Sequence, residues 1–184
     1  GRCTNEELYL FQKFMRLTLG SNHLDSSARY GQMNSVQALR RVQGTHRWTV
    51  TFEDLGAADV LLLVGTNITE TNPITGLAIK EAVKKRHATL ITIESLQPAI
   101  GTISNIVNLS QHHFCVSPTL FRTAILGLQK AVVEQNLIAA DLTQQRSSFV
   151  TAVTARLQQL PWQDIQTATG AGQEAYAAAA QALA

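Results

Sequence analysis

The sequence predicts an α/β fold in which a mainly parallel sheet is flanked by helices. Three consecutive features lead to this prediction: an apolar run over residues 59–64, a helical pattern over 73–86, and a second apolar run over 89–94. Apolar runs without polar alternation are typical of strands that are buried on both faces. A strand, a helix and a strand in this order form a βαβ unit, and its crossover is right-handed in nearly all proteins.

Two helical segments are predicted before this unit. The first begins at Asn5, with Thr4 or Asn5 as the N-cap, and ends at Gly20. Its apolar stripe consists of Leu8, Phe11, Phe14, Met15 and Leu19. Residues 21–34 are polar and rich in turn formers, so they predict a loop, and residues 36–42 predict a short second helix.

The chain after the βαβ unit is predicted to contain one more strand and then helices. Residues 114–116 predict a short strand, and residues 119–135 an apolar helix behind it. After Asp141 the pattern is helical throughout, with segments at 147–160, 162–169 and 173–184. We therefore expect a domain of residues 1–140 and a helical extension of residues 141–184. Because the chain starts without an initiator Met, we also expect it to be a fragment of a longer polypeptide.

The composition excludes several functional classes. Hydrophobic residues make up 45% of the chain and charged residues 15%, which allows a sizeable core and indicates a partner. The net charge is only +2, so we expect no nucleic-acid partner. Cys3 and Cys115 are far apart and have no ligand-like neighbours, which excludes a zinc or iron–sulfur site within this chain. The longest apolar run is far shorter than the roughly 20 residues of a membrane helix, and we expect no direct membrane insertion.

Candidate binding residues lie where the two predicted central strands end. The loop from Gly65 through Asn67 to Glu70 follows a strand and precedes a helix, and backbone N–H groups in such a loop can hold a phosphate. The loop has a single glycine, however, and an ordinary turn is the simpler interpretation. Glu94 ends the second strand and could accept ribose hydroxyls, although a solvated or capping carboxylate is again the simpler interpretation.

Other polar residues give weaker indications. His23, Asp25 and Arg29 lie close together, but no nucleophile accompanies them, so we interpret them as loop hydrogen-bonding groups. His112 and His113 are adjacent and, in a strand, would point to opposite faces, where they could not bind one metal ion. We interpret them as surface or interface residues, and no catalytic residue and no metal ligand is predicted.

A set of motifs extends over most of residues 4–94. They are Thr4-Asn5-Glu6-Glu7, Tyr9, Gln12-Lys13-Phe14, Arg16, Gly20-Ser21-Asn22, Asp25, Ala28-Arg29, Leu55, Ala58-Asp59, Val64-Gly65-Thr66-Asn67, Glu70, Pro73 and Gly76. In these motifs the chain resembles the molybdopterin oxidoreductase family, which includes formate dehydrogenase catalytic subunits and the G subunit of respiratory complex I. Thr169-Gly170 and the helix after it resemble the family more weakly. The resemblance implies a Rossmann-like sheet with its cofactor side at residues 65–70 and at Glu94.

The sequence departs from the family pattern at three places. Where formate dehydrogenases carry a Cys or selenocysteine ligand to molybdenum and then a His, this chain has Gly31 and Gln32. Glycine offers no soft anionic ligand, and a Gln side chain cannot transfer a proton near neutral pH. The family's acidic residue followed by Pro-Arg is replaced by Glu94-Ser95-Leu96, and a later cofactor loop by Ser117-Pro118-Thr119-Leu120, in which proline lacks an N–H donor.

The resemblance and these departures together imply a structural, cofactor-free domain of the G subunit of NADH-quinone oxidoreductase (complex I), within an assembly that transfers electrons from NADH to quinone. Gly65, Asn67, Glu70 and Glu94 would be vestigial cofactor contacts, and iron–sulfur clusters would be bound elsewhere in the parent chain. The partners would be the remainder of its own subunit and other subunits of the respiratory complex. We expect it in the cytoplasm, peripheral to the inner membrane.

Two alternatives remain open. The chain could be a domain of a formate dehydrogenase-like molybdoenzyme that binds molybdopterin guanine dinucleotide and takes its metal ligand from another residue. It could also be a free-standing nucleotide-binding protein, which its abrupt start and incomplete loops disfavour.

Overall fold

The computed structural model describes residues 3–45, 50–95 and 106–184. The chain forms two compact units, Gly1–Thr49 and Val50–Ala184. The first unit is helical, and the second contains the sheet. None of the described helices has the length and apolarity that crossing a bilayer requires.

The first unit consists of two helical segments. Helix α1 (Asn5–Lys13) begins with a capping box: the Glu7 backbone N–H donates to Thr4 Oγ1 over 3.2 Å, and the Thr4 N–H donates to the Glu7 carboxylate over 2.8 Å. A π-helical turn (Phe14–Thr18) continues it toward Gly20, which adopts a left-handed conformation with φ of 60°. The predicted first helix and its Thr4 cap are therefore confirmed.

Helix α2 (Ala28–Gln43) begins earlier than the sequence predicted. The expectation of a loop over residues 21–34 is wrong from Ala28 onward. A local turn starts the helix there, because the Ala28 N–H donates to Ser26 Oγ over 3.3 Å and Arg29 pairs with Asp25 over 3.1 Å. Gly31 and Asn34 suggested a turn because they are poor helix formers, but helix propensity is a weak preference that local hydrogen bonds can override.

The second unit is built on a sheet of three parallel strands. The strands are β1 (Val60–Val64), β2 (Thr89–Glu94) and β3 (His112–Cys115), in the order β1-β2-β3. Leu62 pairs with Ile91, and Ile93 pairs with Phe114. Helix α5 (Pro73–Arg86) connects β1 to β2, as the βαβ pattern predicted. The α/β fold with a parallel sheet flanked by helices is confirmed.

The third strand begins two residues earlier than the predicted segment 114–116. His112 and His113 belong to it, and the Gln111 N–H donates to the Leu90 carbonyl over 2.9 Å at its start. This start was not predicted, because histidine is less typical of strands than the apolar residues that follow. A short 3-10 helix (Ile106–Leu109) precedes the strand and buries Ile106.

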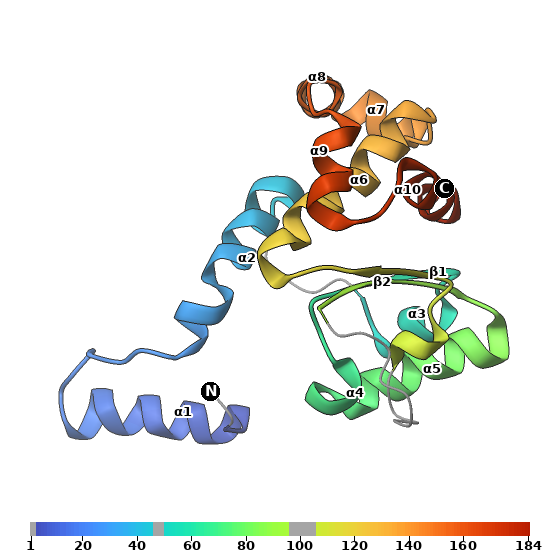
Figure 1. The fold of residues 1–184 in the computed structure, drawn as a ribbon. Coiled ribbons are helices and arrows are strands. Elements are labelled where there is room, and N and C mark those ends of the chain that lie inside the picture. Colours follow the sequence, from blue (N-terminus) through green and yellow to red (C-terminus); the bar gives the residue numbers. More distant parts are fainter. Residues whose placement is uncertain (1–2, 46–49, 96–105) are drawn as a thin grey trace. The chain divides into compact units, whose positions relative to one another are not determined.

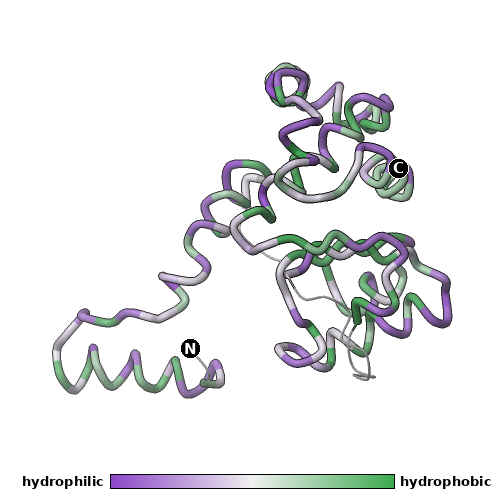
Figure 2. Tube along the Cα trace, viewed as in Figure 1, coloured by the Kyte–Doolittle hydropathy of each residue, from purple (hydrophilic) through white to green (hydrophobic). Residues whose placement is uncertain are grey.

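Helices cover both faces of the sheet (Figure 1). On one face, Ile79 and Val83 of α5 pack against Leu61 and Leu90, close to the short helices α3 (Phe52–Ala57) and α4 (Ile68–Thr71). On the other face, α6 (Phe121–Glu134) and α10 (Gln173–Ala182) pack against Ile91, Ile93 and Phe114. Figure 2 shows hydrophobic residues concentrated along the strands, with hydrophobic and hydrophilic residues mixed in the helices on both sides. The second strand is thus buried from both sides.

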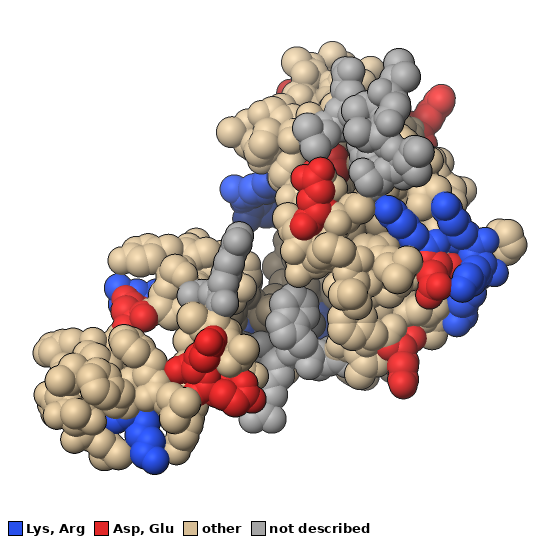
Figure 3. All heavy atoms as spheres, turned by 90° about the horizontal axis from the view of Figure 1, so that it is seen from below, with Lys and Arg blue, Asp and Glu red and all other residues tan. Residues whose placement is uncertain are grey.

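The outer surface of α5 is charged at its C-terminal end. Lys84, Lys85 and Arg86 form its last turn, where cations interact favourably with the helix dipole. Lys85 pairs with Glu81 over 2.8 Å, and Arg86 donates to the carbonyl of Ala57 over 3.2 Å. Figure 3, which shows the molecule from below, shows Lys and Arg side chains gathered at the right of the view. The polar surface of α5 thus lies opposite the apolar surface that covers the sheet.

The C-terminal part is helical, as predicted, and contains α7 (Ala140–Gln145), α8 (Ser147–Gln158), α9 (Trp162–Thr169) and α10. Helix α7 was not predicted. Tyr176 anchors α10, because its ring is fully buried, stacks on Phe114 at 4.6 Å and donates its hydroxyl to Thr169 Oγ1 over 3.0 Å. Helix α10 therefore belongs to the core over the sheet. The domain division at residue 140 stays a prediction.

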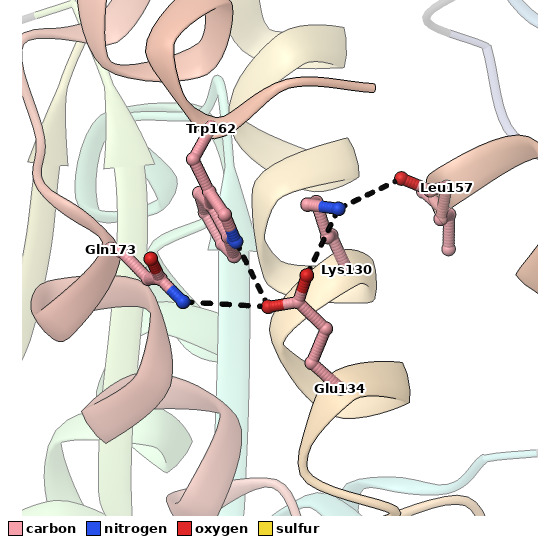
Figure 4. Close-up of polar contacts among 5 residues, drawn as sticks. All are labelled: Lys130, Glu134, Leu157, Trp162 and Gln173. Atoms are coloured by element: carbon pink, nitrogen blue, oxygen red, sulfur yellow. Dashed lines mark hydrogen bonds and ion pairs between the residues drawn. The ribbon is translucent and has the colours of Figure 1, made fainter. Parts of the chain in front are cut away.

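A buried charged group joins four of these helices (Figure 4). Lys130 of α6 is 5% exposed, pairs with Glu134 over 3.0 Å and donates to the Leu157 carbonyl in α8 over 3.0 Å. Glu134 also accepts from the indole N–H of Trp162 in α9 over 2.9 Å and from the Gln173 amide of α10 over 3.5 Å. A buried charge needs such partners because desolvation is costly. Lys130 and Glu134 therefore fix the helices to one another.

Replacing Glu134 with Ala should destabilise the protein more than replacing Lys130 with Met. Glu134→Ala leaves the Lys130 ammonium buried with the Leu157 carbonyl and the Trp162 ring as partners but without a counter-ion. This should cost about 2–3 kcal/mol, less than for a fully buried pair, because Glu134 itself is partly exposed. Lys130→Met removes the buried charge and fills its space, at a cost of less than about 1.5 kcal/mol. Chemical unfolding measures both values.

The double variant serves as the control for this prediction. In Lys130→Met/Glu134→Ala no unpaired charge remains, so its loss should be smaller than the sum of the two single losses. Additive losses would show that the pair makes no coupled contribution.

Candidate functional site

The carboxyl ends of three parallel strands lie at one edge of the sheet. The segment after β1 begins at Gly65, Glu94 ends β2, and the segment after β3 leads through Ser117-Pro118 into α6. Ligands of open α/β sheets bind beyond this edge. It is therefore the candidate functional site, and it contains the predicted positions Gly65, Asn67 and Glu94.

Gly65 is held by both the backbone and a neighbouring ring. Its φ of +61° is a conformation that other residues rarely adopt, and its N–H donates to the Ile93 carbonyl over 2.8 Å. A Cβ atom on Gly65 would lie 2.5 Å from Cε2 of Phe121, the first residue of α6. The glycine thus allows the end of β1 to approach α6 closely.

Asn67 and Glu70 belong to the short segment that follows. Asn67 occupies the N-cap position of α4 without a capping side-chain bond, and its carbonyl accepts the N–H groups of Glu70 and Thr71, each over 3.0 Å. Glu70 is exposed on α4. Because α4 has only four residues, these two residues form a local turn and Glu70 does not join the buried part of the site.

Glu94 is the buried charged group of the site. The residue is 5% exposed, and its Oε1 accepts the backbone N–H of Thr66 over 2.6 Å. A buried carboxylate needs hydrogen-bond donors because it has lost its water. The carboxylate therefore fastens the segment after β1 to the end of β2. No residue type could have indicated Thr66, because it contributes a backbone N–H that every residue except proline has.

His113 lies on the same face of the sheet as Glu94. It pairs with Thr92 across the sheet, and its Nδ1 lies 2.8 Å from Thr92 Oγ1. Burial lowers the pKa of His113, and the Glu94 charge partly opposes this effect. Nε2 is buried and has no hydrogen-bond partner among the described residues. The ring of His113 is half-buried and hydrogen-bonded within the sheet, and its interpretation as a surface or interface residue stays a prediction.

The residues at the place of the family's metal ligand belong to the first unit, whereas the sheet belongs to the second. Gly31 and Gln32 are exposed residues of α2, in the first unit. In the same unit, Arg29 of α2 pairs with Asp25 over 3.1 Å, and the absence of a catalytic role stays a prediction. Leu96, the last residue of the altered Glu94-Ser95-Leu96 sequence, is outside the described residues.

The donor groups present do not fit a molybdenum centre. Gly31 has no side chain, and Gln32 offers only a neutral amide. In the described part of the chain, no three His, Cys, Asp or Glu side chains lie close enough to hold a metal ion. The nucleotide half fits poorly, because Glu94 is only 5% exposed and because Pro118 lacks an N–H. We therefore assign no step of chemistry to a bound cofactor here.

Known proteins resemble this chain along most of its length. The sequence profile described as molybdopterin oxidoreductase matches residues 1–176. NADPH-Fe(3+) oxidoreductase subunit alpha of Geobacter sulfurreducens is 28% identical over 98% of this chain and 21% of that protein. F420-dependent formate dehydrogenase subunit alpha of Methanocaldococcus jannaschii is 28% identical over 80% of this chain and 21% of that protein. The chain thus spans about a fifth of the length of these two relatives.

A solved structure shares the fold. Acetylene hydratase from Pelobacter acetylenicus superimposes with a TM-score of 0.71, over 93% of this chain and 22% of that chain. The sequence identity is 18%, so this likeness concerns the fold alone.

Glu94→Ala should lower the free energy of unfolding far more than Glu94→Gln. Alanine leaves the Thr66 N–H without an acceptor and opens a cavity, which should cost about 2–3 kcal/mol of unfolding free energy. The Gln side chain keeps an acceptor oxygen of the same shape, so the loss should stay near 1 kcal/mol. Chemical unfolding measures stability, and hydrogen exchange at the Thr66 amide reports the bond itself. Equal losses in both variants, or a Thr66 amide that Glu94→Ala does not affect, would disprove this role.

Proposed function

This chain belongs to the molybdopterin oxidoreductase family, and we propose that it serves as a structural domain of its parent protein and holds no molybdenum cofactor itself. The observation that carries the proposal is the Gly31-Gln32 pair. It stands where the resemblance places the soft anionic ligand and the proton-transferring residue of formate dehydrogenases. The side chain of Gly31 is a hydrogen atom and cannot bind a metal, and the neutral amide of Gln32 cannot transfer a proton.

The state of the sheet edge supports the same proposal. A ribose-binding carboxylate must be able to reach the hydroxyl groups of its ligand, whereas Glu94 is only 5% exposed and one of its two oxygens accepts the Thr66 N–H. Pro118, in the segment before α6, removes one more backbone donor. Gly65, Asn67, Glu70 and Glu94 are then vestigial cofactor contacts, and the first and last of these now stabilise the fold.

For the parent assembly we propose an NADH-quinone oxidoreductase of the complex I type, with this chain as part of its G subunit. The chain aligns over 98% of its length with a relative whose name specifies NADPH as electron donor, which supports an assembly linked to a nicotinamide donor. Iron–sulfur clusters would lie elsewhere in the subunit. The partners would be the rest of that subunit and its neighbours, at the cytoplasmic surface of the inner membrane.

The second candidate is a domain of a formate dehydrogenase-like molybdoenzyme that binds molybdopterin guanine dinucleotide. A formate dehydrogenase subunit aligns with 80% of this chain, and a carboxylate is kept at the end of β2. In this case an oxygen ligand from another residue or from water would replace the missing soft ligand.

Elemental analysis of the full-length protein separates the two candidates. The protein should be expressed in cells that make the cofactor, with a molybdoenzyme expressed in the same cells as the loading control. We expect neither molybdenum nor tungsten above background, and we expect Gly31→Cys not to create formate oxidation, because the nucleotide contacts are altered as well. Stoichiometric molybdenum or tungsten in the wild-type protein would reject the structural proposal and support the second candidate.

A further inference from the structure

Strand β3 comes last in the strand order, and in the sheet of the described residues it pairs with β2 alone. It has four residues. Just before it, the Gln111 N–H donates to the Leu90 carbonyl over 2.9 Å, and just after it, the Val116 N–H donates to the Glu94 carbonyl over 2.8 Å. The carboxyl edge of the sheet is therefore closed on this side by a short strand that is held at both ends.

The ring of His113 lies between these two bonds and is half-buried. Its Nδ1 lies 2.8 Å from Thr92 Oγ1, and its Nε2 is buried without a hydrogen-bond partner in the part of the chain that the structure describes. A neutral imidazole has one N–H group, whereas the protonated ring has two. Protonation would therefore add a charge and leave the Nε2 N–H without an acceptor, and both are costly in a site that has lost its water.

The face of the sheet on which His113 lies has few titratable groups. Thr92, Glu94 and His113 lie on the face that α5 covers, and so does Cys115, two residues after His113. On this face of β2 and β3, the other titratable groups among the described residues are the Glu94 carboxylate and the Cys115 thiol.

The elements that cover this face present apolar side chains to it. The α5 residues that are buried against the sheet are Gly76, Ile79, Ala82 and Val83, and the short 3-10 helix Ile106–Leu109 has no titratable residue. His112 points to the opposite face, which α6 covers with Lys130 and Glu134. Glu94 is therefore the charge that acts on His113.

The direction of the pH effect follows from these surroundings. Burial lowers the pKa of His113, and the Glu94 charge opposes this effect without cancelling it. The pKa of the ring in the sheet is therefore below its ordinary value of about 6.5 in an open chain. Because the open form then binds more protons, the closed edge is fully stabilised above about pH 6.5 and loses stability as the pH falls through the lower pKa.

We propose that His113 is an acid-sensitive switch, whose protonation releases β3 from β2 and opens the carboxyl edge of the sheet beside Glu94. A protonated ring regains water by leaving the face of the sheet, and this movement breaks its contact with Thr92. Because β3 has four residues, the backbone bonds at its two ends are lost together with the pairing. The neutral ring keeps the edge closed, whether or not the parent protein binds a cofactor.

Hydrogen exchange in the full-length protein, resolved to single amides and corrected for the intrinsic pH dependence of exchange, tests the switch. Between about pH 7.5 and pH 5.5, protection of the Gln111 and Val116 amides should fall at least about threefold. The amides of Gly65 and Thr89 are the internal controls, because they donate to Ile93 and Asp59 within the β1–β2 pair, and their protection should stay constant. Constant protection at Gln111 and Val116, or an equal loss at all four amides, would overturn the proposal.

Two histidine variants assign the effect to one ring. His113→Gln keeps a polar side chain beside Thr92 but cannot gain a proton, so the pH dependence at Gln111 and Val116 should disappear. His112→Gln, its matched control on the opposite face of the same strand, should retain the pH dependence. A pH dependence that persists in His113→Gln, or that is lost in His112→Gln, would show that His113 is not the switch.

The titration of the ring gives an independent check in the wild-type protein. With carbon-13 at Cε1 of histidine, the His113 signal in the full-length protein should titrate with a pKa below about 6.5. Its midpoint should coincide with the loss of protection at Val116. A pKa of His113 above this ordinary value would show that the sheet stabilises the protonated ring and would contradict the switch.

Discussion

The structure of the second unit depends on the burial of β2 from every side. Leu90, Ile91, Thr92 and Ile93 have no exposed surface. The two flanking strands satisfy the backbone of β2, and a helical layer is needed on each face to cover its side chains. A strand enclosed in this way cannot tolerate an unsatisfied polar group, because such a group costs about 1–3 kcal/mol. The same constraint governs its last residue, Glu94.

The enclosure of β2 explains why Glu94 is bound to the protein itself. The carboxylate is buried at the point where the sheet would contact a ligand, and its Oε1 accepts a hydrogen bond from the Thr66 N–H. Gly65 and Phe121 then close the neighbouring space between β1 and α6. The edge that the resemblance assigns to a nucleotide is thereby used to hold loops in place. Under the proposed function, the family fold persists without its cofactor contacts, because the contacts that remain stabilise the sheet.

The central βαβ unit could be predicted from the sequence because its signals are local. Unbroken apolar runs mark β1 and β2, and Pro73 and the basic turn at Arg86 mark the two ends of α5. The start of α2 could not be predicted, because a hydrogen bond from Ala28 to Ser26 outweighs the poor propensity of Gly31 and Asn34. The start of β3 was missed for a similar reason, since pairing with β2, and not strand propensity, brings His112 and His113 into the sheet.

The candidate site was only partly predictable. Gly65 and Glu94 were identified from their places after two strands, and both lie at the sheet edge. The partner of Glu94 is a backbone N–H, which leaves no trace in a sequence. The network of Lys130, Glu134 and Trp162 was also missed, because it joins helices far apart along the chain. Sequence patterns reveal faces and ends of elements, whereas such long-range polar contacts are known only once the elements are packed.

Calorimetric titration with guanosine diphosphate, which stands for the nucleotide half of the cofactor, tests the central claim most directly. The full-length protein should show no binding at nucleotide concentrations up to about 1 mM, which corresponds to less than about 4 kcal/mol of binding free energy. Micromolar binding that is lost in Glu94→Gln, without a matching loss of stability, would show that Glu94 still serves a nucleotide and would contradict the account.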